Sequence, residues 1–182
     1  MRWADVEAQQ PRLAAVGLEK LGSPGVVLVG TVRRDGSPRI TPVEPFFWEG
    51  ELWLTMGLDS WKARDLTRDP RVLVHSIVTS PDGRAGEYKL RGRAILEDDP
   101  GLNESVADAV ASRKDYEPVP GKFHLFRVEI DEIAFVRWGD DNDQYLTRWP
   151  PGVEQLRRGT SATSNAPPEP YRELLVAASS AK

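Results

Sequence analysis

The chain has 182 residues, of which 40% are hydrophobic and 29% charged, so one domain can bury a core of its own. Its formal net charge of −4 gives no bulk electrostatic reason to bind nucleic acid or an anionic membrane, so any anion site must be local. The absence of cysteine excludes disulfides and fits a reducing compartment. The N-terminus lacks a signal-peptide pattern and the apolar runs are too short to cross a bilayer, so we expect a soluble, cytoplasmic protein.

The N-terminal part predicts a covering helix followed by a β-hairpin. Pro11 is suited to open the helix and Gly22 to end it. The apolar run that begins at residue 26 predicts a strand, and the Asp-Gly pair at 35–36 is typical of a tight hairpin. The second strand, at residues 38–47, contains three prolines that cannot donate ladder hydrogen bonds. This pattern favours a sheet edge, a bulge or a ligand-facing stretch.

Residues 50–70 are the most informative stretch, because an alternating strand leads directly into a short basic helix. Ser60 can cap that helix, whose first turn has unpaired backbone N–H groups and a partial positive charge. A phosphate docked there would gain hydrogen bonds and favourable field together. Lys62 and Arg64 add two full charges nearby. The alternative is an ordinary surface helix with solvated basic side chains.

The rest of the chain predicts more strands and one more helix. The helix is expected to begin at Pro100 and to end near Lys114, at its negative end. Further strands are expected at residues 71–78, 86–96, 123–138 and 144–149. Many short strands joined by hairpins, with few helices, indicate a mainly β (α+β) fold and a closed antiparallel barrel rather than a parallel sheet.

The C-terminal segment has a different composition. Residues 158–170 are rich in Ser, Thr, Ala and Pro without periodicity, which predicts a flexible linker. Residues 171–178 are expected to form either a short docking helix or a disordered tail. We therefore expect a cofactor-binding domain at 1–157 and a linker with a short helix or tail at 158–182.

The order of these elements resembles the pyridoxamine 5′-phosphate oxidase-like, FMN-binding split-barrel family, over roughly residues 26–138. The likeness is carried by a strand, an Asp-Gly hairpin, two strands, a Ser-x-Lys-Ala helix that ends in Asp-Pro, a strand, and a long strand with Arg-Gly-Arg-Ala. It implies a six-stranded antiparallel split β-barrel of Greek-key topology with short flanking helices. It also implies a homodimer with FMN at its interface, with Trp138 or Trp149 as candidates for residues donated by the partner, and an oxidoreductase acting on a small organic substrate.

The resemblance also assigns site residues. The flavin-contacting second strand falls on residues 39–42, with Arg39 reaching the cofactor, and Ser60 and Lys62 fall on the phosphate-binding turn. The candidate cofactor-binding residues are Arg39, Ile40, Thr41, Pro42, Thr55, Met56, Ser60, Trp61, Lys62, Arg64 and Glu87. No catalytic side chain is assigned, because the flavin itself would carry the electrons.

Two candidate residues differ from the oxidase pattern. Trp61 stands where the oxidase has arginine, and Arg64 is expected to replace that charge. Glu87 stands where the oxidase has a glutamine beside the flavin ring, and a carboxylate there disfavours the anionic reduced flavin. If the site has adapted to FMN, Glu87 is expected to point away from the ring or to pair with Arg91.

The activity is left between alternatives. The oxidase proper ends in an arginine- and tryptophan-bearing segment that holds its substrate, and this chain ends differently, so pyridoxamine phosphate oxidation is not the first choice. A deazaflavin-dependent reductase, with an 8-hydroxy-5-deazaflavin cofactor in place of FMN, is the first alternative, and Arg64, Arg91 and Arg93 would guide its longer anionic tail. A cofactor-binding protein without turnover is the second.

Other chemistries lack a motif. The sequence has no Gly-x-Gly-x-x-Gly turn, no phosphate-binding Gly-Lys-Ser/Thr loop and no Gly-x-Ser-x-Gly elbow. The acidic run at 140–143 lacks the ligand spacing of a calcium loop, and the two histidines, His75 and His124, both fall in expected strands. We expect no metal site.

Overall fold

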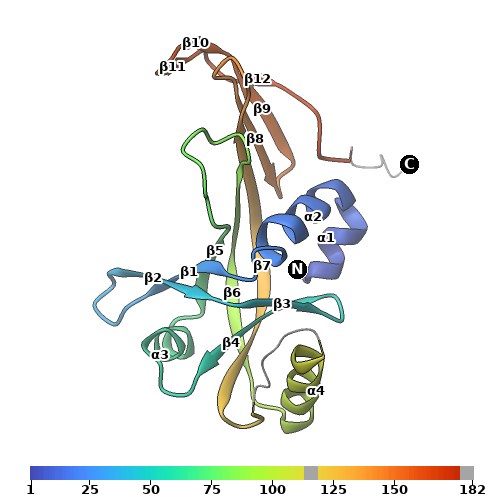
Figure 1. Cartoon of the computed structure of the whole chain (residues 1–182), viewed down its shortest axis with the longest axis vertical. Coiled ribbons are helices and arrows are strands. Elements are labelled where there is room, and N and C mark those ends of the chain that lie inside the picture. The colour runs from blue at the N-terminus through green and yellow to red at the C-terminus, as the bar shows by residue number, and fades with distance from the viewer. Residues whose placement is uncertain (113–118, 177–182) are drawn as a thin grey trace.

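The computed structural model describes residues 1–112 and 119–176, which form antiparallel β-sheet with short helices at its sides (Figure 1). The N-terminal cover consists of α1 (Trp3–Gln9), α2 (Pro11–Gly17) and the π-helical turn η1 (Leu18–Gly22). The sequence missed α1. Its first turn is closed by Asp5, whose Oδ2 accepts a hydrogen bond from the backbone N–H of Arg2 at 2.7 Å.

The strands match the expected hairpin pattern. The first seven are β1 (Val27–Val32), β2 (Pro38–Val43), β3 (Pro45–Trp48), β4 (Glu51–Gly57), β5 (Arg71–His75), β6 (Glu87–Glu97) and β7 (Phe123–Trp138). The last five are β8 (Gln144–Trp149), β9 (Val153–Arg157), β10 (Gly159–Ser161), β11 (Ser164–Asn165) and β12 (Glu169–Pro170). The helices α3 (Trp61–Arg68) and α4 (Pro100–Ala111) complete the fold, and Lys114 lies outside the described residues.

The strand order confirms a mainly β split-barrel fold. In the described residues the main sheet runs β12-β9-β8-β7-β6-β5-β1-β2, and β4 pairs with β7 and with β3. The strand predicted at 38–47 is split at Glu44 into β2 and β3. If β2 and β3 are counted as one strand, they and β1, β4, β5, β6 and β7 correspond to the six expected barrel strands.

The expectation of a closed barrel is corrected. β2 pairs with β1, and β3 pairs with β4, but the two halves of this strand do not complete a ring. Pro42 and Pro45 lie on either side of Glu44, where β2 ends and β3 begins. A proline has no N–H to donate to a ladder that would close the sheet. The sheet therefore stays split on the side of the molecule where the candidate site residues of β2 lie.

The core has two parts. The main cluster packs the inward residues of the sheet against the N-terminal cover, where Trp3, Leu13 and Leu21 are fully buried. A smaller cluster packs α4 against the other face of β4, with Trp53 and Val106 at its centre. Because β4 is covered on both faces, nearly all of its side chains are buried.

The C-terminal segment extends the sheet. The part predicted to be a linker forms β10, β11 and β12, and Glu169 in β12 is paired with Leu156 in β9. Residues 171–176 form no helix, and residues 177–182 lie outside the described part of the chain. The boundary at residue 157 stays a prediction. In the described residues, no helix is both long and apolar enough to cross a membrane.

Candidate functional site

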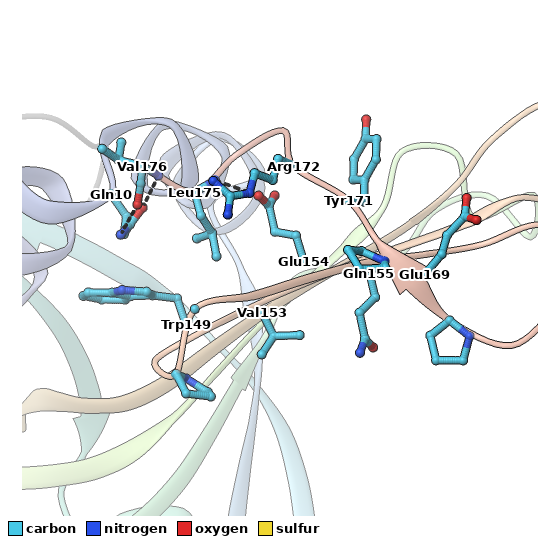
Figure 2. Close-up of a pocket in the computed structure, with 14 residues that line it drawn as sticks. Gln10, Trp149, Val153, Glu154, Gln155, Glu169, Tyr171, Arg172, Leu175 and Val176 are labelled. Carbon is cyan, nitrogen blue, oxygen red and sulfur yellow. Dashed lines mark hydrogen bonds between the residues drawn. The ribbon is translucent and has the colours of Figure 1, made fainter. Parts of the chain in front are cut away.

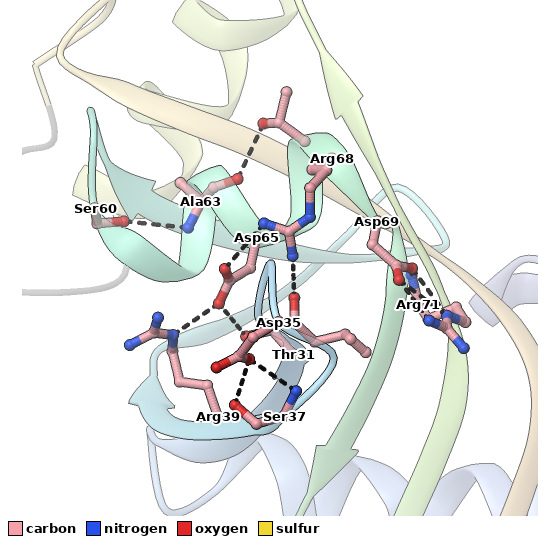
Figure 3. A network of polar contacts seen from close by, with 12 residues as sticks. Thr31, Asp35, Ser37, Arg39, Ser60, Ala63, Asp65, Arg68, Asp69 and Arg71 are labelled. Carbon is pink, nitrogen blue, oxygen red and sulfur yellow. Dashed lines mark hydrogen bonds and ion pairs between the residues drawn. The ribbon is translucent and has the colours of Figure 1, made fainter.

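The basic helix α3 begins as the sequence predicts. Ser60 has extended backbone angles (φ −61°, ψ 146°), and its Oγ accepts a hydrogen bond from the backbone N–H of Ala63 at 3.4 Å (Figure 3). The turn before it, from Gly57 to Ser60, is closed by a backbone hydrogen bond of 3.2 Å. This turn places the N-terminus of α3 beside the end of β4.

A cavity of about 300 Å³ opens beside this N-terminus. It brings together four candidate residues from three separate segments, namely Pro42, Thr55, Met56 and Lys62. Its other lining residues are Val43, Glu44, Gly57, Lys122 and Phe123. β4 and β7 build the shared wall, since Met56 is paired with His124 and Gly57 with Phe123.

The two lysines give this cavity its positive charge. In the described part of the chain, neither Lys62 nor Lys122 forms an ion pair or a side-chain hydrogen bond. Lys62 comes from the first turn of α3, and Lys122 from the loop before β7. The cavity also contains one carboxylate, that of Glu44, which has a partner of its own.

Arg39 was expected to reach the cofactor, but in the structure its guanidinium group is held by Asp65. Its Nε donates to Oδ2 of Asp65 at 2.7 Å, and the same oxygen accepts from the Thr31 hydroxyl at 3.0 Å (Figure 3). Arg68 adds a contact of 3.5 Å to the other carboxylate oxygen. The Asp65 side chain is only 5% exposed. The two terminal nitrogens of Arg39 make no further hydrogen bond to the described residues.

The charge state of Asp65 follows from these contacts. Burial by itself raises the pKa of a carboxyl group, but the hydrogen bonds from Arg39 and Thr31 outweigh it and hold the pKa of Asp65 below its ordinary value. Asp65 is therefore a buried carboxylate that anchors Arg39 to α3. The sequence did not single it out, although a carboxylate on the apolar side of a short helix is a usable signal.

Trp61 and Ile40 lie on the surface near this cluster. Each is 68% exposed, which is unusual for large apolar side chains. The guanidinium carbons of Arg39 and Arg64 lie 5.9 Å and 5.4 Å from the centre of the Trp61 ring. Arg64 also pairs with the exposed Asp59 at 3.3 Å. The indole is thus a platform flanked by two cations.

Thr41 has an unsatisfied hydroxyl. Its Oγ1 is buried and finds no hydrogen-bond partner among the described residues. Buried polar atoms are normally paired, so this atom needs an acceptor or donor that the described chain does not supply. Thr41 adjoins Pro42, which lines the cavity.

Glu87 lies far from the cavity in the same chain. It is paired with Val136 on β7, whereas Thr55 is paired with Leu125, eleven positions away. Eleven residues of strand span roughly 35 Å. Glu87 also does not pair with Arg91: its carboxylate lies 2.6 Å from Lys89 Nζ and 3.3 Å from His75 Nε2.

A second cavity, of about 700 Å³, lies beneath the C-terminal segment (Figure 2). The buried carboxylate of Glu154 accepts hydrogen bonds from the backbone N–H groups of residues 173–175, at 2.8 to 3.3 Å. Gln10 holds Val176, whose N–H donates to Gln10 Oε1 at 2.7 Å. These contacts fasten the segment across β9, and they involve none of the candidate cofactor-binding residues.

Comparisons with known proteins identify the family and similar folds. The family model described as pyridoxamine 5′-phosphate oxidase matches residues 17–137. No curated protein matches the chain.

Three solved structures are similar to the chain. A NimC/NimA family protein from Clostridium acetobutylicum shares 21% identity over 78% of this chain and 97% of its own, with a TM-score of 0.59. A protein from Listeria innocua named as a candidate pyridoxamine 5′-phosphate oxidase shares 21% identity over 65% and 93%, with a TM-score of 0.53. A heme binding protein from Mycobacterium smegmatis shares 20% identity over 73% and 57%, with a TM-score of 0.53.

At these identities, the likeness to the solved structures supports the fold alone. The family rests on the family model, which matches two thirds of the chain and includes all eleven candidate cofactor-binding residues. The chain belongs to the pyridoxamine 5′-phosphate oxidase family.

Proposed function

We propose that the chain is an FMN-binding oxidoreductase that acts on a small organic substrate. Proteins of this family usually bind a flavin. The observation that carries the proposal is the cavity at the N-terminus of α3, which joins Pro42, Thr55, Met56 and Lys62 in one place. These four residues come from three separate elements, β2, β4 and α3, which the fold brings to one cavity.

The phosphate of FMN is assigned to the N-terminal end of this cavity. The α3 backbone N–H groups and Lys62 supply hydrogen bonds and charge there. Ser60 keeps the first turn ordered by capping Ala63, so the donors are held in place before the anion arrives. When bound, the flavin supplies the electron transfer, and this chain positions it and limits its contact with water.

The dimethylbenzene and pyrimidine parts of the flavin need more surface than this cavity has. The exposed side chains of Ile40 and Trp61 offer apolar contacts. Members of the family commonly form dimers. We infer that a second copy covers Ile40 and completes the site. The β7 residues that pair with Glu87 and with Thr55 are separated by roughly 35 Å of strand. A Glu87 side chain beside the flavin would therefore have to come from the partner subunit.

A deazaflavin-dependent reductase is the second candidate. The guanidinium of Arg64, 5.4 Å from the Trp61 ring, lies at the surface and could meet an anionic tail. Of the other expected guides, Arg91 is exposed and lies 4.0 Å from Glu132, and Arg93 is exposed on β6. FMN stays our first choice because the cavity beside α3 gathers four of the residues expected to bind it. Mass spectrometry of the small molecule released by denaturing the purified protein distinguishes the two cofactors.

Replacing Lys62 tests the proposal. We expect Lys62→Ala to weaken FMN binding by about 1.5 to 3 kcal/mol, the range for a charge-assisted hydrogen bond, and to leave the melting temperature nearly unchanged. Fluorescence titration of FMN gives the two dissociation constants. Lys20→Ala is the matched control, since Lys20 pairs with Glu19 on the N-terminal cover. Equal FMN affinity in the wild type and Lys62→Ala would remove α3 from the site.

A further inference from the structure

Lys122 lines the cavity but is not among the cofactor-binding residues that the sequence predicts. It comes from the loop that precedes β7 and is separated from Lys62 by 60 positions in the sequence. Its side chain nevertheless lines the same cavity of about 300 Å³ as Lys62, next to Phe123. Its backbone N–H donates to the carbonyl of Val119 at 3.0 Å, which helps to define the loop.

Two ammonium groups that have no partner among the described residues line one small concave space, together with the Glu44 carboxylate, which has a partner of its own. Lys62 and Lys122 form no ion pair with the described residues, whereas most charged residues of the neighbouring elements do. Like charges that share a concave site repel each other and concentrate positive potential there. An anion with one charge compensates one ammonium group. A dianion compensates both.

We propose that Lys122 is a second phosphate-binding residue of this cavity, and that the pair Lys62 and Lys122 makes the site selective for a dianionic phosphomonoester. This inference rests on the proposed function and sharpens it, because FMN carries a phosphomonoester, whereas a phosphodiester has one negative charge and riboflavin has none. Lys122 acts by binding the ligand and has no assigned role in proton or electron transfer.

The experiment compares FMN with riboflavin. We expect Lys122→Ala to raise the dissociation constant of FMN about three- to tenfold, since the side chain is exposed, and to leave that of riboflavin unchanged. Lys122→Arg keeps the charge and should stay close to the wild type. The effect on FMN should shrink as the salt concentration rises. A similar loss for both flavins, or no loss for FMN, would overturn the role of Lys122.

A second measurement separates this inference from the proposed function. Inorganic phosphate, compared with chloride at equal ionic strength, should raise the melting temperature of the wild type more than that of Lys122→Ala or Lys62→Ala. Phosphate protection that depends on both lysines, without any FMN binding to the wild type, would leave the anion site standing and overturn the FMN assignment. Phosphate protection that is equal in all three proteins, or absent from all, would overturn the role of Lys122.

Discussion

Individual side chains decide the charge balance of the site. Arg39 was expected to meet the cofactor, but its Nε is committed to Asp65, and only its terminal nitrogens are left for a ligand. Lys62 and Lys122 line the cavity and have no such partner within residues 1–112 and 119–176. The role of Lys62 in binding phosphate stays a proposal, while Arg39 has a structural contact with Asp65.

Asp65 gives a prediction on stability and pH. Because the folded-state pKa of Asp65 lies below its unfolded value of about 3.9, its contribution is present above that value and is lost as pH falls through the folded-state pKa. We expect Asp65→Asn to lower the free energy of unfolding by about 1 to 3 kcal/mol at pH 7, since Arg39 loses a charged partner.

Urea unfolding of the wild type and Asp65→Asn at several pH values measures this difference. It should be largest near neutral pH and should shrink once the carboxyl group is protonated in both states. The exposed Asp108 on α4 provides the control, and Asp108→Asn should change the free energy of unfolding little at any pH. A difference that stays constant down to pH 2 would show that the charge of Asp65 is not what stabilises the fold.

Among the elements, the strands and the capped helix α3 follow from local patterns. Alternation, Asp-Gly turns and a serine before a basic helix are short-range signals, and they predicted β1, β4 to β8 and α3. The helix α1 was missed because its apolar residues, Trp3 and Val6, occupy a segment of only seven residues. Its stability comes from packing against the sheet, which no local pattern reveals.

Gly92 provides a prediction about the central strand pair. At this position the register of β6 and β7 shifts, and an added Cβ would lie 2.0 Å from the carbonyl oxygen of Glu129. We expect Gly92→Ala to cost at least about 2 kcal/mol of unfolding free energy, because the obstacle is backbone and cannot rotate away. Gly57, in β4, has open space at the same position, so Gly57→Ala should be nearly neutral. Chemical denaturation compares the two variants, and equal effects would contradict the steric explanation.

In the whole molecule, the incomplete site predicts an assembly. We expect the protein to be a dimer at micromolar concentration, with a mass twice the 20.3 kDa of one chain, because the exposed Ile40 and the open cavity need a cover. Ile40→Asp should shift the protein toward monomer and weaken FMN binding together. Leu18→Asp, on the N-terminal cover, is the control. Light scattering reports the mass, and a monomer that binds FMN with full affinity would rule out a shared site.

The sequence by itself determined the class of fold, the order of its strands and the start of α3, because periodicity, turns and caps act over a few residues. The resemblance to the family predicted Thr55, Met56 and Lys62 as cofactor-binding residues, and their role stays a prediction. Only the tertiary structure placed Lys122 beside Lys62, joined Arg39 to the buried Asp65, and separated Glu87 from the cavity. Those relations depend on strand register and on contacts between distant segments, and a one-residue change of register would reverse which face each side chain occupies.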